Sequence, residues 1–344
     1  MKFKTLLIGL GRIASLLEKD KFRYHPCTHA GVLFSPFGKK HFELSGIYDT
    51  DKEQTQQFLK QWNLNPKNLP YQISDLQNQY FDFAIIASSS EAHFENTQLA
   101  IDLGIRNLLI EKPICISKQQ LKKLVHLKDK FALNIWVNHE RRYHAFYRYV
   151  KDLIQTNQYG ELRTIKASVL TSFRDPGNAF SGGGGPLLHD GTHAVDYIDY
   201  LLECEPIKVE SKLIKANSMS KIEEQAIALL TYPQNVFVFL EAGGKRKYFQ
   251  FEIDIQTEEA RFLLSNDGHH FYISKPSKLY KGFRSLTEIP LPKIKKTESN
   301  PWINLYQEIV QVLSGKSSKI IGSLDANIRI YHTLDTIYKK AKQS

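Results

Sequence analysis

The chain has 344 residues, of which 42% are hydrophobic and 24% charged, a composition typical of soluble globular proteins long enough for two domains. Its formal net charge of +10 favours anionic ligands in general, but the lysines are scattered and the densest basic patch, residues 293–296, is short. We therefore expect a solvated basic surface and no nucleic-acid partner. The three cysteines form no Cys-x-x-Cys pair, which argues against a disulfide framework or a thiolate zinc site and favours a reducing compartment.

No apolar run approaches the ~20 residues that a membrane span requires. The run Leu6–Leu10 near the start is interrupted by glycine and followed at once by Arg12, which is unlike a secretion signal. We therefore expect a cytoplasmic protein with no membrane partner.

The first part of the chain alternates short apolar runs with longer polar stretches of helical periodicity. The runs are residues 4–9, 44–49, 81–87, 107–110 and 133–137. This alternation is typical of β-α-β units and predicts an α/β domain with a parallel sheet over residues 1–138.

The pattern changes after Asn138. A helical stretch at residues 146–157 is followed by strand-like runs without long helices between them, at residues 161–170, 223–232, 235–244, 248–257 and 260–268. Two further helices are expected at residues 300–315 and 324–343. We therefore predict a second, α+β domain over residues 139–344, built on an open-faced, mainly antiparallel sheet.

The first strand leads into Gly9, Gly11 and Ala14, spaced as G-x-G-x-x-A, with a helical segment expected beyond. In this pattern the first glycine permits a tight turn, the second lets backbone N–H groups approach a pyrophosphate, and the third small residue allows close packing of helix and strand. The second strand ends in Asp49, an acid placed to bind the adenine ribose hydroxyls of NAD. A Rossmann dinucleotide-binding domain follows as the prediction.

Arg12 and Ile13 belong to the same glycine loop and are further candidates for contact with the cofactor. Asp49 favours NAD over NADP, because a carboxylate repels the 2′-phosphate. NADP stays possible, since Arg12 and Lys52 could attract that phosphate.

The interval from the glycines to Asp49 is longer than the usual 20 to 25 residues. The surplus lies in an insertion around the first helix, Glu18–Lys40, which contains His25, Cys27 and His29. These three side chains resemble a metal cluster, but no fourth ligand is evident, so we expect a packing role and no metal.

Two more strand ends carry polar residues where the cofactor should pass. Ser88, Ser90 and His93 follow the third strand, beside the expected path of the ribose and phosphates. Glu111 and Lys112, followed by a proline, end the fourth strand. A lysine at this position is costly to desolvate, which favours a functional role.

The segment LLHDGTHAVD, residues 187–196, places His189 and His193 four residues apart, the spacing of two zinc ligands on a helix. A zinc hydrolase would need a third ligand and a glutamate base, whereas the segment has an aspartate and Gly191 inside the supposed metal helix. An imidazole titrates near neutral pH and passes protons in either direction. We therefore favour proton transfer by His193 over metal binding.

Four segments together resemble the glucose-fructose oxidoreductase, inositol dehydrogenase and rhizopine-catabolism family, Gfo/Idh/MocA. They are the G-x-G-x-x-A loop, FDFAIIASSSEAHFENTQLAIDLGIRNLLIEKP, RRYHAFYRYVKDLIQTNQYGELRTIKASV and GGGGPLLHDGTHAVDYIDYLL, in order from Phe3 to about Cys204. The resemblance implies a nicotinamide domain, an open-faced sheet domain, and hydride transfer between NAD(P) and a secondary alcohol of a sugar, cyclitol or related compound.

Position by position, the resemblance implies that Lys112 stabilises the substrate oxygen and that His193 is the acid-base residue. Many members have an aspartate four residues before that histidine, where this chain has His189. Asp190 at i−3 could still serve His193 on a helix, and Asp196 at i+3 could orient the imidazole instead.

The resemblance also places Arg142, Tyr143 and His144 in the substrate cleft, and the glycines at 182–185 are expected beside the nicotinamide. His189 is a further candidate for substrate binding. A homodimer or homotetramer is plausible on the same ground.

Two alternatives keep the fold and change the function. The chain could be a non-catalytic NAD(P)-binding sensor, although Lys112 and His193 argue against that because a sensor needs no proton relay. It could also be a redox-neutral NAD-dependent glycosidase or epimerase, in which transient oxidation drives the reaction.

Overall fold

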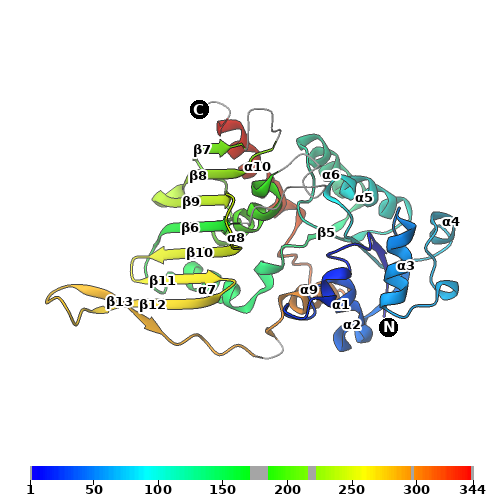
Figure 1. The fold of residues 1–344 in the computed structure, drawn as a ribbon, viewed down its shortest axis with the longest axis horizontal. Coiled ribbons are helices and arrows are strands. Elements are labelled where there is room, and N and C mark those ends of the chain that lie inside the picture. The colour runs from blue at the N-terminus through cyan, green and yellow to red at the C-terminus, as the bar shows by residue number, and fades with distance from the viewer. Residues whose placement is uncertain (1, 171–184, 216–221, 296–297, 342–344) are drawn as a thin grey trace. The chain divides into compact units, whose positions relative to one another are not determined.

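The computed structural model describes residues 2–170, 185–215, 222–295 and 298–341, which form two compact units (Figure 1). Unit 1 comprises Met1–His144 and Thr297–Leu324, and unit 2 comprises Ala145–Lys296 and Asp325–Ser344. The sequence predicts a single boundary after residue 138. The structure differs in that the chain returns to unit 1 near the end, where helix α9 (Pro301–Leu313) buries Trp302, Leu305 and Tyr306 in the core of the first sheet.

Unit 1 contains a five-stranded parallel sheet in the order β2-β1-β3-β4-β5. The strands are β1 (Phe3–Ile8), β2 (Phe42–Tyr48), β3 (Phe83–Ile86), β4 (Asn107–Ile110) and β5 (Asn134–Val137). All five coincide with the predicted apolar runs, which confirms the α/β Rossmann-type domain. Because β1 lies between β2 and β3, the strand order reverses there, and such a switch point is where open parallel sheets bind ligands.

Helices cover both faces of this sheet, and their apolar faces form its core. The helices are α1 (His29–Phe34), α2 (Pro36–His41), α3 (Lys52–Gln61), α4 (Ile73–Leu76), α5 (His93–Asp102), α6 (Lys118–Phe131) and α9. Leu7, Phe83 and Trp136 face α1, α3 and α9 in one cluster, while α5 packs on β3 and β4.

Unit 2 is built on an eight-stranded sheet in the order β13-β12-β11-β10-β6-β9-β8-β7. The strands are β6 (Leu162–Leu170), β7 (Lys208–Ile214), β8 (Gln225–Tyr232), β9 (Val236–Gly243), β10 (Gln250–Thr257), β11 (Ala260–Ser265), β12 (Gly268–Pro276) and β13 (Arg284–Ile289). Only β6 and β9 pair in parallel among these strands. The mainly antiparallel α+β domain is thus confirmed, and β7, β12 and β13 are additional to the predicted strands.

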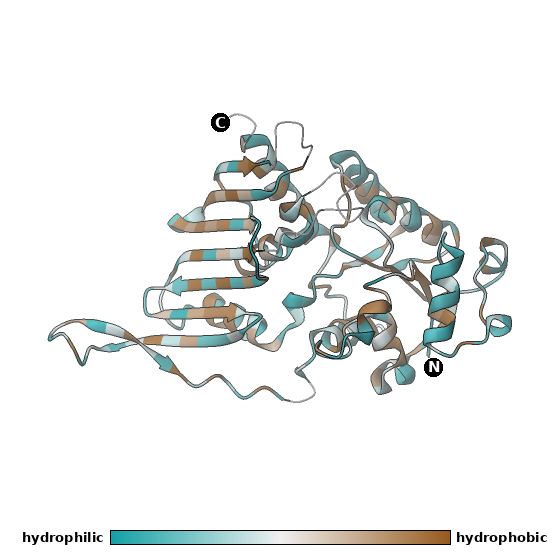
Figure 2. Cartoon of the chain, viewed as in Figure 1, coloured by the Kyte–Doolittle hydropathy of each residue, from teal (hydrophilic) through white to brown (hydrophobic). Residues whose placement is uncertain are grey.

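One face of the second sheet is covered and the other is open. Helices α7 (Ala145–Gln155), α8 (Thr192–Leu202) and α10 (Leu324–Ala341) contribute buried apolar side chains to a single core with the strands. Along β8 and β9 buried residues alternate with more exposed ones, and Ile227, Phe237 and Phe239 are exposed. Figure 2 shows hydrophobic residues along most of both strands, so the exposed positions carry apolar side chains as the buried ones do.

Among the described residues, no helix combines the length and the apolar character needed to cross a membrane.

Candidate active site

The glycine loop after β1 is shaped by the backbone of Gly9. Its φ of +85° is left-handed, and a Cβ there would lie 2.4 Å from the Ser88 nitrogen, so only glycine fits. A Cβ on Gly11 would instead meet nothing within 4 Å, which leaves its backbone open to an approaching ligand. The loop therefore touches the end of β3 on one side and is open on the other, as a pyrophosphate site requires.

Asp49 lies directly beside this loop despite the long interval in sequence. Its Oδ2 accepts a hydrogen bond from the Leu10 nitrogen at 2.8 Å, and its Oδ1 accepts one from the Asp51 nitrogen at 2.9 Å. Gly9 also donates to the Tyr48 carbonyl at 2.8 Å, so the ends of β1 and β2 are joined. The half-buried carboxylate is thus held at the position of a ribose-binding acid.

The surplus residues form a loop that interrupts the first helix. The sequence predicts a helix directly beyond Ala14, but only the short 3-10 helix Leu16–Lys19 follows before α1 begins at His29. The His29 and Ala30 nitrogens donate to the carbonyls of Ile13 and Ala14, at 3.3 and 2.9 Å. These hydrogen bonds join α1 directly to residues 13 and 14, and residues 15–28 form a loop between them.

Arg12 is exposed and Ile13 half-buried at the start of the interrupted helix, immediately after Gly11. Both therefore lie next to the glycine loop, where the sequence predicts contact with the cofactor. That contact stays a prediction.

The residues after β3 separate into two groups. Ser88 lies against Gly9, and its hydroxyl accepts a hydrogen bond from Asn96 at 2.9 Å, while Ser90 is half-buried at the start of a 3-10 turn. His93 is buried, and its ring contacts the carbonyls of Pro113 at 2.8 Å and Ser88 at 3.1 Å. Desolvation lowers the pKa of His93, and the two carbonyls and the charge of Glu111 act in the opposite direction. The ring thus links the ends of β3 and β4, and its contact with a cofactor stays a prediction.

Glu111 is directed into unit 1. Its carboxylate contacts His29 at 3.0 Å and accepts hydrogen bonds from Asn138 and from the Lys112 backbone nitrogen, the latter at 3.2 Å. Burial alone would raise its pKa, but the contacts with His29 and Asn138 and the charge of Lys112 outweigh desolvation and lower the pKa of Glu111. The buried carboxylate is therefore ionised and fixes the backbone of Lys112, which is itself half-buried.

Sequence reasoning missed this support. It places His29 in a packing role and does not consider Asn138 or Tyr306, whose hydroxyl lies 2.7 Å from His29 Nδ1. These residues are 109 or more positions from one another, so no local pattern indicates that they meet.

Arg142 and Tyr143 are packed within unit 1. The Tyr143 side chain is fully buried, and its hydroxyl donates to Glu308 at 2.8 Å. Desolvation and the Glu308 charge raise the pKa of Tyr143 well above its ordinary value. Arg142 is also buried and donates to the Ile321 carbonyl at 3.2 Å. Their assignment to the substrate cleft stays a prediction, and their burial favours a packing role.

The histidine segment of unit 2 is not a regular α-helix. Residues Leu187–Gly191 form a π-helical turn, and α8 begins only at Thr192. Hydrogen bonds in a π-helix run from i to i+5, so the i−3 and i−4 spacing used to relate Asp190 and His189 to His193 does not apply. This geometry corrects the expectation of one regular helix. Single π-helical turns are frequent at functional sites.

Burial distinguishes the two acids near His193. His189, Asp190 and His193 are half-buried, whereas Asp196 is completely buried. Of the glycines before this segment, 182–184 lie outside the described residues, and Gly185 is buried.

Glu223 is a further residue that the sequence did not single out. It is buried, and its Oε1 accepts hydrogen bonds from the Leu187 nitrogen at 3.0 Å and from the Tyr338 hydroxyl at 2.9 Å. Desolvation raises the pKa of Glu223. This carboxyl anchors the start of the π-helical turn, and an acid at the first residue of a predicted strand carries no sequence signal for that role.

Family profiles match both units. Residues 3–139 match the oxidoreductase family with an NAD-binding Rossmann fold, GFO/IDH/MocA, and residues 147–263 match the GFO/IDH/MocA C-terminal domain. The open loop at Gly11 and the acid at Asp49 fit this cofactor.

Curated relatives are similar over part of their length. The glucose-6-phosphate 3-dehydrogenase of Bacillus subtilis is 26% identical over 202 residues, which are 56% of this chain and 55% of the relative. The D-glucoside 3-dehydrogenase of Escherichia coli is 24% identical over 64% of this chain and 59% of its own. The matches therefore span little more than half of these relatives.

Solved structures agree in fold over the whole chain. The WlbA dehydrogenase from Bordetella pertussis, in complex with NADH and UDP-GlcNAcA, has a TM-score of 0.76 at 18% identity and covers 100% of this chain and 97% of its own. The UDP-N-acetylglucosamine 3-dehydrogenase from Acidithiobacillus ferrooxidans has a TM-score of 0.76 at 15% identity, covering 100% and 99%. With both profiles matched in order, the chain belongs to the GFO/IDH/MocA family of oxidoreductases and carries its NAD-binding Rossmann domain.

Proposed function

We propose that the chain is an NAD-dependent oxidoreductase that transfers hydride between nicotinamide and a secondary alcohol or ketone of a sugar or sugar derivative. The observation that carries this proposal is the glycine loop, where Gly9 closes the turn, Gly11 is open, and Asp49 is held beside them. The family match and the presence of both Lys112 and His193 support a catalytic role over a purely sensing one.

The proposed chemistry divides between two side chains. Bound nicotinamide supplies the hydride acceptor or donor. His193 removes the proton of the substrate hydroxyl during oxidation and returns it during reduction. Lys112 donates a hydrogen bond to the same oxygen and stabilises developing alkoxide charge. We propose that either Asp190 or the buried Asp196 orients His193, and that His189 contacts the substrate.

We propose the C3 hydroxyl of a hexopyranose as the position of reaction. Three proteins similar to this chain are named as 3-dehydrogenases, of glucose 6-phosphate, of D-glucosides and of UDP-N-acetylglucosamine. The three substrates differ in what is attached to the sugar, so the shared feature is the ring position. The formal charge of +10 makes phosphorylated or nucleotide-linked sugars the first candidates.

A binding and activity panel tests the proposal. NAD and NADP are titrated against the protein, followed by reduction assays with free, phosphorylated, glycosidic and nucleotide-linked hexoses and with cyclitols. We expect NAD to bind more tightly than NADP, because Asp49 repels a 2′-phosphate. If neither dinucleotide binds, the proposal fails.

Two substitutions separate an enzyme from a sensor. Lys112→Ala and His193→Ala should abolish turnover and leave NAD affinity within a few fold. Exposed Lys122→Ala and His126→Ala on α6 are matched controls and should leave both unchanged. Product analysis without added cofactor reveals a redox-neutral glycosidase or epimerase, which would release product with no net NADH.

We also propose that the protein works in the cytoplasm as a homodimer or homotetramer. The three cysteines, Cys27, Cys115 and Cys204, are all free, as a reducing compartment favours. The exposed Ile227, Phe237 and Phe239 on the open sheet supply apolar surface for association. Light scattering on the purified chain measures the oligomeric state, and a monomer at micromolar concentration contradicts the proposed homodimer or homotetramer.

A further inference from the structure

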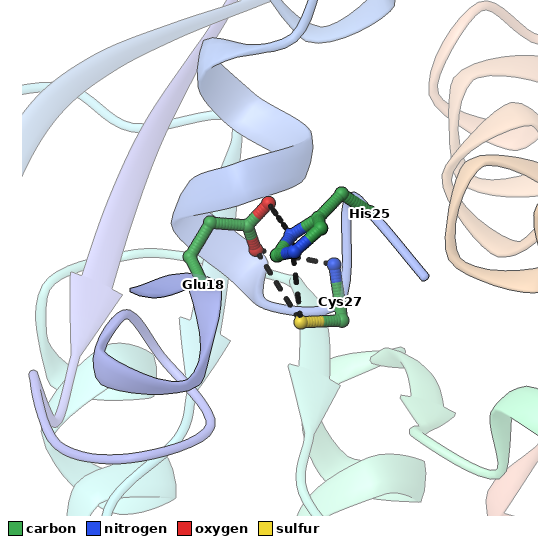
Figure 3. Close-up of side chains that lie close together, drawn as sticks. All are labelled: Glu18, His25 and Cys27. Atoms are coloured by element: carbon green, nitrogen blue, oxygen red, sulfur yellow. Dashed lines mark hydrogen bonds and ion pairs between the residues drawn. The ribbon is translucent and has the colours of Figure 1, made fainter. Parts of the chain in front are cut away.

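The loop that interrupts the first helix brings together three different metal-binding side chains, which we name the Glu18–His25–Cys27 cluster (Figure 3). His25 Nδ1 lies 3.0 Å from Glu18 Oε1 and 3.9 Å from Cys27 Sγ, and Cys27 Sγ lies 3.7 Å from Glu18 Oε2. The sequence considered His29 in place of Glu18, but the His29 ring is bound to Glu111 and Tyr306.

These separations are close to those of ligands around one tetrahedral ion. With bonds of about 2.0 Å to nitrogen or oxygen and about 2.3 Å to sulfur, neighbouring ligand atoms around a tetrahedral ion lie about 3.3 Å apart for N and O and about 3.5 Å apart for S with N or O. The distances from His25 Nδ1 to Glu18 Oε1 and to Cys27 Sγ, 3.0 and 3.9 Å, each differ from these by a few tenths of an ångström. The 3.7 Å contact of Cys27 Sγ is made to the other carboxylate oxygen, Oε2, and one ligand atom from each side chain lies within 4.8 Å of the other two. Small side-chain adjustments therefore suffice to form a three-ligand site.

The cluster is accessible from solvent yet anchored in the fold. The His25 and Glu18 side chains are 36% and 16% exposed, so an ion can reach them, whereas Cys27 is buried. Glu18 is also tied to the start of α1, because its Oε2 accepts hydrogen bonds from the Cys27 nitrogen at 3.1 Å and the Thr28 hydroxyl at 2.7 Å. One carboxylate oxygen thus holds the backbone, and the other faces His25.

We propose that the Glu18–His25–Cys27 cluster binds one divalent transition-metal ion, with zinc as the representative, and leaves the fourth position to water. A thiolate, an imidazole and a carboxylate are a ligand set suited to zinc and too soft for magnesium or calcium. As the zinc–sulfur bond forms, the Cys27 thiol gives up its proton to solvent. The bound ion joins Glu18 to His25 and Cys27, and thus connects the two ends of the loop that follows the glycine loop in sequence.

The site is separate from the hydride-transfer chemistry proposed above. All three proposed ligands belong to the loop at residues 15–28, and neither Lys112 nor His193 is one of the ligands. Its role would be to stiffen the segment between Gly11 and α1, so its presence does not depend on the proposed substrate.

Metal analysis of the full chain tests the proposal. Apo protein is titrated with zinc against a chromophoric chelator, and bound metal is counted after desalting. We expect one tight equivalent per chain, with binding weakened at least about tenfold in both Cys27→Ala and His25→Ala. The matched controls Cys204→Ala and His126→Ala alter a half-buried cysteine and an exposed histidine outside the cluster and should retain the tight equivalent.

A second measurement on the unaltered chain covers the case in which a variant fails to fold. Zinc should slow alkylation of Cys27 by iodoacetamide, read by peptide mass spectrometry, and leave the rate at Cys204 unchanged. Equal rates at Cys27 with and without zinc, or equal zinc affinity in the two cluster variants and the unaltered chain, overturn the proposal. The contacts of Glu18 would then serve only as a hydrogen-bonded loop closure.

Discussion

Each of the two units contains a glycine beside residues that the sequence predicts to be functional, but the reason for glycine differs between the two positions. Gly9 of unit 1 has a φ of +85°, which a side chain rarely adopts. Gly191 of unit 2 has an ordinary helical φ of −62°, and there a Cβ would crowd Ala242 at 3.0 Å and Leu187 at 3.1 Å. Position 9 favours glycine because of its backbone conformation, and position 191 favours glycine because of its packing against a neighbouring strand.

The two units also differ in the pKa of a buried glutamate that accepts a backbone hydrogen bond near the candidate residues. Glu111 accepts a hydrogen bond from the Lys112 nitrogen, and Glu223 accepts one from the Leu187 nitrogen. The pKa of Glu111 is lowered, since His29, Asn138 and Lys112 overcome its desolvation, whereas desolvation dominates for Glu223 and raises its pKa. Two similar anchors should therefore respond to pH in opposite directions.

The largest effect is expected at Gly9. Gly9→Ala combines a left-handed φ with a contact of 2.4 Å to the Ser88 backbone, so we expect a loss of about 3–5 kcal/mol in the free energy of unfolding. Gly104→Ala is the matched control, because Gly104 has the same φ of +85° and no atom within 4 Å of its Cβ position. Urea denaturation of both variants separates the cost of the left-handed φ from the cost of the contact with Ser88. Equal losses of unfolding free energy would mean that the contact with Ser88 adds nothing.

Glu111→Gln should cost about 2 kcal/mol at pH 7, because an amide offers one acceptor oxygen where the buried carboxylate offered two. The folded pKa of Glu111 lies below its ordinary value near 4.5, so its stabilising contribution is present above that pH and is lost as the pH falls. The difference in unfolding free energy between the variant and the unaltered protein should thus shrink on acidification. A difference that stays constant as the pH falls from 7 to well below 4.5 contradicts the assignment of an ionised carboxylate.

Glu223→Gln should have a smaller effect of about 1 kcal/mol with the opposite pH trend. The folded pKa of Glu223 is raised above its ordinary value near 4.5, so its contribution is full below that pH and declines as the pH rises through the folded pKa. The variant, which cannot ionise, should therefore gain stability relative to the unaltered protein as the pH rises. If Glu111→Gln and Glu223→Gln show the same pH trend, the contrast between the two anchors is wrong.

The sequence predicts the regular elements of both units because their burial follows simple periods. The five parallel strands are continuous apolar runs, and α9 lies within the predicted range 300–315, with Asn300 as its cap and Pro301 in its first turn. By contrast, β7 and β13 are edge strands with mostly exposed side chains, and the sequence analysis did not predict either of them. The return of α9 to the first sheet depends on which core accepts its apolar face, which a helical pattern does not specify.

The candidate site divides in the same way. Gly9, Gly11 and Asp49 were predictable, since a tight turn and a ribose-binding acid impose residue types at known positions. The partnership of Glu18 with His25 and Cys27 depends on the path of an irregular loop. The π-helical turn before His193 ends at Gly191, which packs against Ala242 of β9, and the sequence alone shows neither the turn nor this contact.

The smallest expected effect tests that packing directly. In Gly191→Ala the better helix propensity of alanine, about 1 kcal/mol, opposes the crowding against Ala242, so the net change in stability should be below about 1 kcal/mol. Ala242→Gly on β9 removes the opposing methyl group, at the cost of glycine in a strand. The double variant should then be more stable than the sum of the two single changes predicts, by about 0.5–1 kcal/mol, because the added methyl occupies the vacated space. Thermal and urea unfolding of the four proteins give this coupling energy. A value near zero would mean that Ala242 does not dictate glycine at position 191, and the requirement would then have to come from Leu187 within the π-helical turn itself.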